Sequence, residues 1–173
     1  MRLEANPPAG VLFDCDGVLV DSEPLHADTW VEVLNPLGFS FGARWFDPWI
    51  GIPDEDLAMH LHEKQGVPLT PNELLDRKRV TYRAAVVAGR LATFPGLKDG
   101  LLRLRSLGLP LAAASNSRIA TVRLCLEKAG LLELLHAVVG VDDVREGKPA
   151  PDLFLEAAQR IRLPACSCVA VED

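Results

Sequence analysis

Four short apolar segments limit the folds open to this chain more than any other feature of its sequence. They span residues 10–14, 109–115, 136–141 and 168–173. Short apolar runs bounded by turn or charged residues are typical of strands that a parallel sheet buries on both faces. Apolar residues at helical spacing precede each of the last three, in 97–107, 119–129 and 152–161. This alternation predicts a doubly wound α/β sheet.

The stretch between the first and second apolar segments is far longer than a simple crossover needs. It contains helical patterns and no convincing strand, and we place the helices at 25–34, 54–65 and 71–87. We therefore expect an α/β core formed by residues 1–21 and 93–173. Residues 22–92 would form a helical subdomain inserted after the first strand.

Composition and charge exclude several classes of protein. The chain has 173 residues, of which 49% are hydrophobic, as in an ordinary globular protein. A net charge of −6 argues against a nucleic-acid partner, since phosphate backbones attract basic patches. No apolar run approaches the roughly 20 residues of a membrane span, and the N-terminus lacks the apolar stretch of a signal peptide. We expect a cytoplasmic protein without a membrane partner, and we expect a monomer.

Two carboxylates follow the first apolar segment directly. Asp14 and Asp16 are separated by one residue, and Gly17 comes next. Two negative charges this close repel each other, which is costly unless a cation binds between them or one carboxylate carries a proton. The pair therefore suggests one carboxylate for nucleophilic attack, one for proton transfer and a metal ion to hold the charge. The alternative is a turn or capping pair with no chemical role.

Polar residues also follow the other three predicted strands. Ser115 and Asn116 end the second, Lys148 lies in the loop after the third, and residues 172–173 (Glu-Asp) end the fourth. Ligands of open α/β sheets bind beyond the carboxyl ends of the strands. The combined set suits phosphoryl transfer, which uses carboxylates for Mg²⁺, a nucleophile, and hydroxyl and ammonium donors. The alternatives are a helix cap for Ser115 and a solvated surface charge for Lys148.

These residues, in this order, resemble the four motifs of the haloacid dehalogenase (HAD) superfamily. Segment 14–22 resembles the first motif, Ser115 the second, Lys148 the third and the pair 172–173 the fourth. The subfamily resembled is that of β-phosphoglucomutase and related sugar-phosphate phosphatases. The resemblance implies a HAD-like Rossmannoid core and a small helical cap after the first motif.

The resemblance also implies roles for the individual residues. Asp14 would attack phosphorus and become an aspartyl phosphate. Asp16 would protonate the leaving oxygen and then activate water or a second substrate hydroxyl. Ser115 and Lys148 would bind the transferred phosphoryl group, and Asn116 is a further candidate for phosphate binding.

The same resemblance implies a Mg²⁺ site at the ends of the first and fourth strands. Asp14, the backbone carbonyl of Asp16, and Asp173 would hold the ion, with Glu172 assisting. Dehalogenases of the superfamily lack the second carboxylate of the first motif, so the presence of Asp16 argues against halide chemistry.

Cap residues are expected to select the substrate. Segment 51–57 resembles the cap loop that begins with a glycine, here Gly51. An arginine of this loop grips the second phosphate in β-phosphoglucomutase, whereas Asp54 stands at that position here, and an acid repels a phosphate dianion. We therefore favour a phosphatase of a small phosphorylated metabolite of the sugar phosphate class over a mutase. His26 stands where related caps carry a histidine. Three cations could replace the missing arginine, namely Arg44, Lys78 and Arg79.

Two classes other than an enzyme remain open. A phospho-accepting receiver domain would carry its phosphorylated aspartate on the third strand and would have no long insert. A catalytically inactive binding protein is the second alternative. The chain ends directly after the fourth predicted strand, where the family resembled continues, so we expect a fragment that binds Mg²⁺ and turns over substrate poorly.

Overall fold

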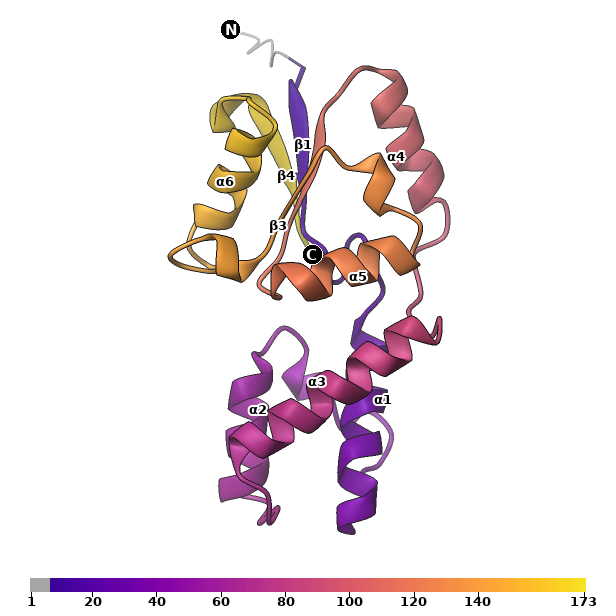
Figure 1. Cartoon of the computed structure of the whole chain (residues 1–173), viewed down its shortest axis with the longest axis vertical. Helices are drawn as coiled ribbons and strands as arrows, with labels where there is room; N and C mark the ends of the chain where they lie inside the picture. Colours follow the sequence, from indigo (N-terminus) through magenta and orange to yellow (C-terminus); the bar gives the residue numbers. More distant parts are fainter. Residues whose placement is uncertain (1–6) are drawn as a thin grey trace, which may run out of the picture. The chain divides into compact units, whose positions relative to one another are not determined.

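The computed structural model describes residues 7–173. The chain divides into two compact units (Figure 1), which we call the α/β unit, up to Asp21 and from Leu91 to Asp173, and the helical unit, Ser22–Arg90. The second boundary was expected two residues later, after residue 92. The Asp21 N–H donates to the Ala92 carbonyl at 3.0 Å, and this bond holds the returning chain against the α/β unit. The expected core segment 1–21 includes six residues outside the described range.

Four parallel strands form the sheet of the α/β unit, in the order β3-β2-β1-β4. They are β1 (Gly10–Phe13), β2 (Leu111–Ala114), β3 (Ala137–Val139) and β4 (Cys168–Val171). Phe13 lies opposite Ala113 of β2 and Val171 of β4, so these three strands end level with one another. The prediction of a parallel α/β sheet is confirmed, and each strand is shorter than its apolar segment.

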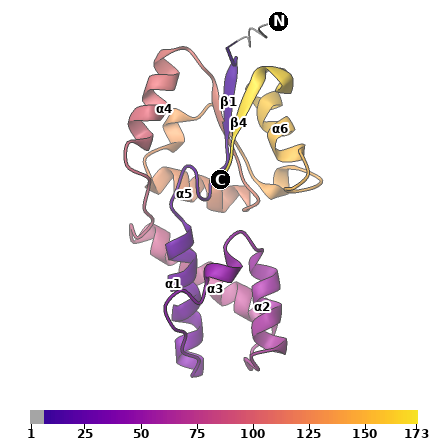
Figure 2. The ribbon, with the colours of Figure 1, turned by 180° about the vertical axis from the view of Figure 1, so that it is seen from behind.

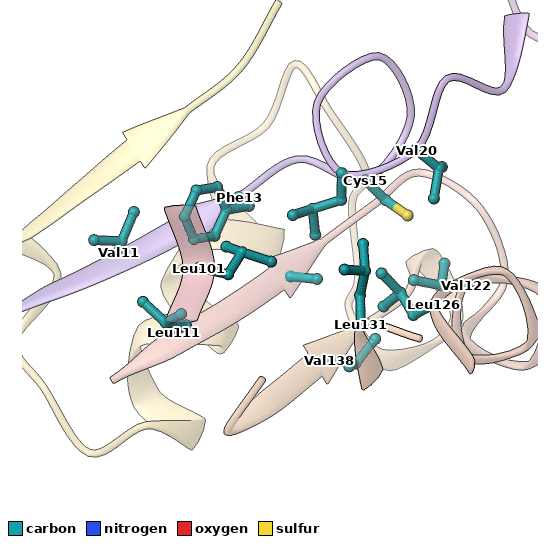
Figure 3. Packing of buried hydrophobic residues seen from close by; sticks show 12 residues of the cluster. Val11, Phe13, Cys15, Val20, Leu101, Leu111, Val122, Leu126, Leu131 and Val138 are labelled. Atoms are coloured by element: carbon teal, nitrogen blue, oxygen red, sulfur yellow. The ribbon is translucent and has the colours of Figure 1, made fainter. Parts of the chain in front are cut away.

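Helices cover both faces of this sheet. They are α4 (Leu97–Ser106), α5 (Ile119–Lys128) and α6 (Asp152–Arg160), and Figure 1 shows α4 and α6 on opposite sides. Phe13 and Leu111 pack with Leu101 of α4 on one face, as Figure 3 shows. Leu12 faces the other way and packs with Leu153 of α6. Alternate residues of a strand point to opposite faces, which is why uninterrupted apolar segments were needed.

Three helices make up the helical unit, together with two short 3₁₀ turns, Asn35–Leu37 and Asp47–Trp49. They are α1 (Glu23–Leu34), α2 (Asp54–Glu63) and α3 (Pro71–Val87). The helix α3 contacts both α1 and α2 (Figure 2). Trp30, Leu57 and Leu74, one from each helix, are buried in a shared core.

Three further 3₁₀ turns lie in the loops of the α/β unit, at Leu132–Leu134, Val141–Asp143 and Ala165–Ser167. All four cysteines are free thiols. Within residues 7–173, no helix is both long and apolar enough to cross a bilayer.

Candidate active site

The polar residues that follow β1, β2 and β4 emerge at one edge of the sheet. The Asp14 N–H extends the ladder by donating to the Val171 carbonyl at 2.9 Å, and the Ser115 N–H donates to the Val139 carbonyl at 3.1 Å. Because these bonds continue the sheet past its last paired residues, the side chains that follow are held on a rigid base. The carboxyl edge therefore gathers side chains from distant parts of the sequence, as expected for an open α/β sheet.

Lys148 joins the ends of β1 and β4. Its Nζ lies 2.8 Å from Asp14 Oδ1 and 2.8 Å from Glu172 Oε1. The Phe154 ring lies beneath the ammonium, with its centroid 4.8 Å from Nζ. The Cys15 N–H also donates to Asp14 Oδ1, at 2.6 Å. Lys148 is therefore an internal cation of the site, and the alternative of a solvated surface charge is wrong.

Burial and charge act in opposite directions on Asp14. Burial raises the pKa of the Asp14 carboxyl above its ordinary value, while the hydrogen bond and charge of Lys148 lower it. Burial also raises the pKa of the neighbouring Cys15 thiol well above its ordinary value, which leaves the thiol protonated and unreactive. Asp14 is therefore the nucleophile candidate of this loop, and its charge depends on Lys148.

Ser115 contacts the second carboxylate of the pair. Its Oγ donates to Asp16 Oδ2 at 3.1 Å and accepts from the Ser117 N–H at 3.0 Å, and the residue is 1% exposed. The cap of α5 comes from elsewhere, since the Ile119 N–H donates to Asp142 Oδ1 at 2.7 Å. Ser115 is thus oriented toward Asp16 and does not cap α5.

Asn116 lies at the same edge, but its carboxamide is directed at the Lys148 backbone. The Lys148 N–H donates to Asn116 Oδ1 at 2.7 Å, and Asn116 Nδ2 donates to the Lys148 carbonyl at 3.3 Å. Phosphate binding by Asn116 stays a prediction. This second role was missed, because no local pattern indicates a bond between residues so far apart in sequence.

Oxygen donors of the type that Mg²⁺ prefers surround the end of β4. The Asp173 carboxylate lies against the backbone of Gly17, so closely that a methyl group there would overlap it. This places Asp173 beside the Asp16–Gly17 segment, and carboxylate and carbonyl oxygens are suitable ligands for Mg²⁺. In the described part of the chain, no three His, Cys, Asp or Glu side chains are grouped closely enough to hold a metal ion. The oxygen donors at the ends of β1 and β4 thus suit Mg²⁺ in chemical type, but the described side chains are not gathered into a formed metal site.

Comparison with known proteins identifies the chain at the level of its family. A model of the haloacid dehalogenase-like hydrolases matches residues 8–173. The chain belongs to this family. It is therefore an enzyme of the phosphoric monoester hydrolase type, and the predicted family is confirmed. The receiver-domain alternative is wrong, because residues 22–90 form a separate unit between the first two strands.

Two relatives of this HAD hydrolase are named as enzymes of phosphorylated sugars. Fructose-1-phosphate phosphatase YqaB of Escherichia coli is 32% identical over 165 residues, which cover 95% of this chain and 86% of that protein. A β-phosphoglucomutase of Bacillus subtilis is 28% identical over 171 residues, covering 94% of this chain and 74% of that protein. A crystal structure of a HAD family hydrolase from Deinococcus radiodurans, with bound phosphate and sodium, is similar with a TM-score of 0.76. It is 32% identical and covers 98% of this chain and 74% of that one.

The helical unit of this HAD hydrolase contains a buried ion pair. Lys78 Nζ lies 2.5 Å from Asp54 Oδ2 and 2.5 Å from His26 Nδ1, and Lys78 is 2% exposed. The Trp30 indole N–H donates to Asp54 Oδ1 at 2.9 Å. Although burial opposes it, the Lys78 ammonium holds the pKa of Asp54 below its ordinary value. Asp54 and His26 are thus brought together by a lysine.

The three cations proposed as substitutes for the missing arginine all face acids of the helical unit. Besides the Lys78 pair, Arg44 Nε lies 2.6 Å from Asp47, and Arg79 lies 3.3 Å from Glu55. Gly51 adopts a left-handed backbone with φ of 75°. One signal could have revealed the pairing of Lys78. Residues 74, 78 and 82 share one stripe of α3, and a lysine on a buried stripe needs an acidic partner.

Proposed function

We propose that this HAD hydrolase removes the phosphoryl group from a small phosphorylated metabolite of the sugar phosphate class. The observation that carries this proposal is the arrangement of Asp14, Lys148, Asp16 and Ser115 at one sheet edge, where a nucleophile, a cation, an acid and a hydroxyl adjoin. The names of its relatives, a fructose-1-phosphate phosphatase and a β-phosphoglucomutase, support this substrate class.

In the first proposed step, an oxygen of Asp14 attacks phosphorus and the bond from phosphorus to the substrate oxygen breaks. Asp16 gives its proton to that leaving oxygen, so a neutral hydroxyl departs. Lys148 is placed to offset the negative charge that Asp14 shares with the incoming phosphate. The Ser115 hydroxyl, which touches Asp16, can turn from that carboxylate toward a phosphoryl oxygen.

In the second proposed step, water replaces Asp14 on phosphorus. Asp16, now ionised, takes a proton from the water as its oxygen bonds to phosphorus, and the bond to the Asp14 oxygen breaks. Inorganic phosphate leaves, and both carboxylates return to their starting states. One acid thus serves as a proton donor in the first step and as a proton acceptor in the second.

We propose Mg²⁺ as the cofactor of this site. Asp14, the Asp16 carbonyl and Asp173 would hold the ion, with Glu172 assisting. When bound, Mg²⁺ supplies positive charge that offsets the phosphoryl oxygens. The small metabolite remains the proposed partner, and the protein is proposed to act as a monomer without nucleic acid or membrane.

The ion pair of Asp54 and Lys78 supports a phosphatase over a mutase. A cap that grips a second phosphate needs a cation available to bind it. Here the buried ammonium of Lys78 already lies 2.5 Å from Asp54, so the pair is close to neutral. A mutase remains the second candidate because a β-phosphoglucomutase is among the relatives.

A phosphate-release assay tests this function. The wild-type protein is given fructose 1-phosphate, other sugar phosphates, phosphoglycolate and nucleotides, each with and without Mg²⁺. Asp14→Asn is the inactive variant, and Asp99→Asn, an exposed change at the start of α4, is its control. Release that requires Mg²⁺ and Asp14 supports the proposal, whereas unchanged release by Asp14→Asn would sink it. A hexose bisphosphate trapped in the assay would favour the mutase.

A further inference from the structure

One side chain ties the loop that carries Lys148 to the end of β2. The Asn116 carboxamide accepts from the Lys148 N–H at 2.7 Å and donates to the Lys148 carbonyl at 3.3 Å. Both bonds go to the same residue, one on each side of its Cα. Two bonds of this kind fix the direction of a backbone segment as well as its distance, so Asn116 determines where the Lys148 side chain begins.

Gly147 is shaped to admit this carboxamide. A Cβ atom at Gly147 would lie 2.6 Å from Asn116 Oδ1 and 3.1 Å from Val141 Cγ2. Real Cβ atoms do not approach an oxygen so closely, so any larger residue at this position would push Asn116 away. The absence of a side chain at Gly147 therefore leaves the space that the Asn116 carboxamide occupies.

The support under Asn116 is firmer than the loop that it holds. Its neighbours in sequence are fixed by the bonds from the Ser115 N–H to Val139 and from the Val141 N–H to the Ser117 carbonyl, both 3.1 Å. By contrast, residues 144–151 form no helix or strand. The rigid end of the sheet thus holds an irregular segment, so we infer that Asn116 fixes the position of the Lys148 backbone and not the reverse.

We propose that Asn116 is a positioning residue, which keeps the Lys148 ammonium at Asp14. Lysine has a flexible four-carbon stem, so the place of its ammonium depends on its backbone and on what lies beside it. Here the backbone is held by Asn116, and the ammonium lies 2.8 Å from Asp14 Oδ1 and above the Phe154 ring. The inference rests on the proposed function in so far as Lys148 serves phosphoryl transfer.

The first test is a crystal structure of Asn116→Ala. It is expected to show Lys148 Nζ moved away from Asp14, beyond the 2.8 Å of the wild type. A structure that keeps this distance overturns the proposal. Should the alanine variant fail to fold, Asn116→Asp replaces it, since the aspartate keeps the acceptor for the Lys148 N–H and loses the donor. This test needs no substrate, so its result is independent of the proposed function.

The second test compares hydrolysis of p-nitrophenyl phosphate with Mg²⁺ by Asn116→Ala, Gly147→Ala and the double variant. A misplacement of about 1 Å costs on the order of 10²-fold, so each single change is expected to lower kcat/KM by about 10- to 100-fold. The double variant is expected to be close to Asn116→Ala, because the severe overlap with Asn116 Oδ1 is then gone and only the milder 3.1 Å contact with Val141 Cγ2 remains. Losses that multiply in the double variant overturn the proposal.

Asn72→Ala, an exposed asparagine of α3, is the matched control and is expected to leave kcat/KM unchanged. A merely structural role of Asn116 is recognised by an unfolding midpoint that falls while Lys148 stays at Asp14, which counts against positioning. A wild-type protein that hydrolyses no phosphomonoester refutes the proposed function, and the crystal structure still decides the role of Asn116.

Discussion

Removing Asp54 should destabilise the helical unit strongly, because it leaves the Lys78 ammonium buried without its acidic partner. The Lys78 side chain is 3% exposed and that of Asp54 is 28% exposed. Removing one partner of a buried pair costs about 3–5 kcal/mol, and the partial exposure of Asp54 favours the lower end, about 3 kcal/mol. With a urea dependence of roughly 1.5 kcal/mol per molar, Asp54→Asn lowers the unfolding midpoint by about 2 M.

Tryptophan fluorescence measures this loss in the helical unit itself, since all three tryptophans (Trp30, Trp45 and Trp49) lie there. Asp76→Asn is the control, because Asp76 is 78% exposed and its loss should cost less than about 1 kcal/mol. Asp54→Asn combined with Lys78→Met should regain most of the stability, since an apolar pair avoids the burial of a lone charge. A double variant no more stable than Asp54→Asn would refute the reasoning.

The lowered pKa of Asp54 determines how its contribution to the free energy of unfolding changes with pH. A carboxyl whose pKa is lower in the folded state stabilises that state above the pKa of the unfolded chain, about 3.9, and loses this effect as the pH falls through the folded value. The difference in unfolding free energy between the wild type and Asp54→Asn should therefore be full near pH 7 and should shrink below about pH 4. A difference that grows on acidification contradicts this assignment.

Two further changes probe the α/β unit. Lys148→Met should lower kcat by on the order of 10²- to 10³-fold. It should also raise the pKa of Asp14 further, because the charge that lowers this pKa is lost. Carbon-13 NMR of the carboxyl group measures the pKa, and an unchanged value would contradict the contact between Lys148 and Asp14. Gly17→Ala should weaken activation by Mg²⁺ and destabilise the fold by about 1 kcal/mol, because Gly17 has a φ of 79° and its added methyl group meets the Asp173 carboxylate. Measurement of the Mg²⁺ concentration for half activation checks this, and an unaltered value with normal stability would refute it.

The sheet could be predicted from sequence because its strands are buried on both faces. Such strands need uninterrupted apolar residues, and these stand out in the sequence. The predicted strand at 109–115 began too early, since the ladder starts at Leu111 and Pro110 contributes its carbonyl to the Val11 N–H from outside. Apolar character marks burial, whereas the ladder ends where the backbone pairing ends.

The partners of the polar residues could not be predicted in the same way. From its place in the cap loop, Asp54 is predicted to face a phosphate of the substrate. In the structure its carboxylate instead contacts Lys78, 24 residues later in the sequence. The sequence predicts Asn116 as a phosphate ligand, which stays a prediction, and gives no sign that its carboxamide bonds Lys148, 32 positions away. Such contacts depend on how separate elements pack, which periodicity within a single element does not specify. The ends of the strands were predictable because parallel strands must finish at a common edge.

The central place of β1 in the sheet has a consequence for how the protein is made. Both neighbours of β1, the strands β2 and β4, follow the helical unit in the sequence. The helical unit is one continuous segment with local contacts, and such segments fold fast, whereas pairing between distant strands is slow. During synthesis, the helical unit can fold while the strand that carries Asp14 still lacks both neighbours. An exposed apolar strand in this interval is the point at which chaperones would be needed most.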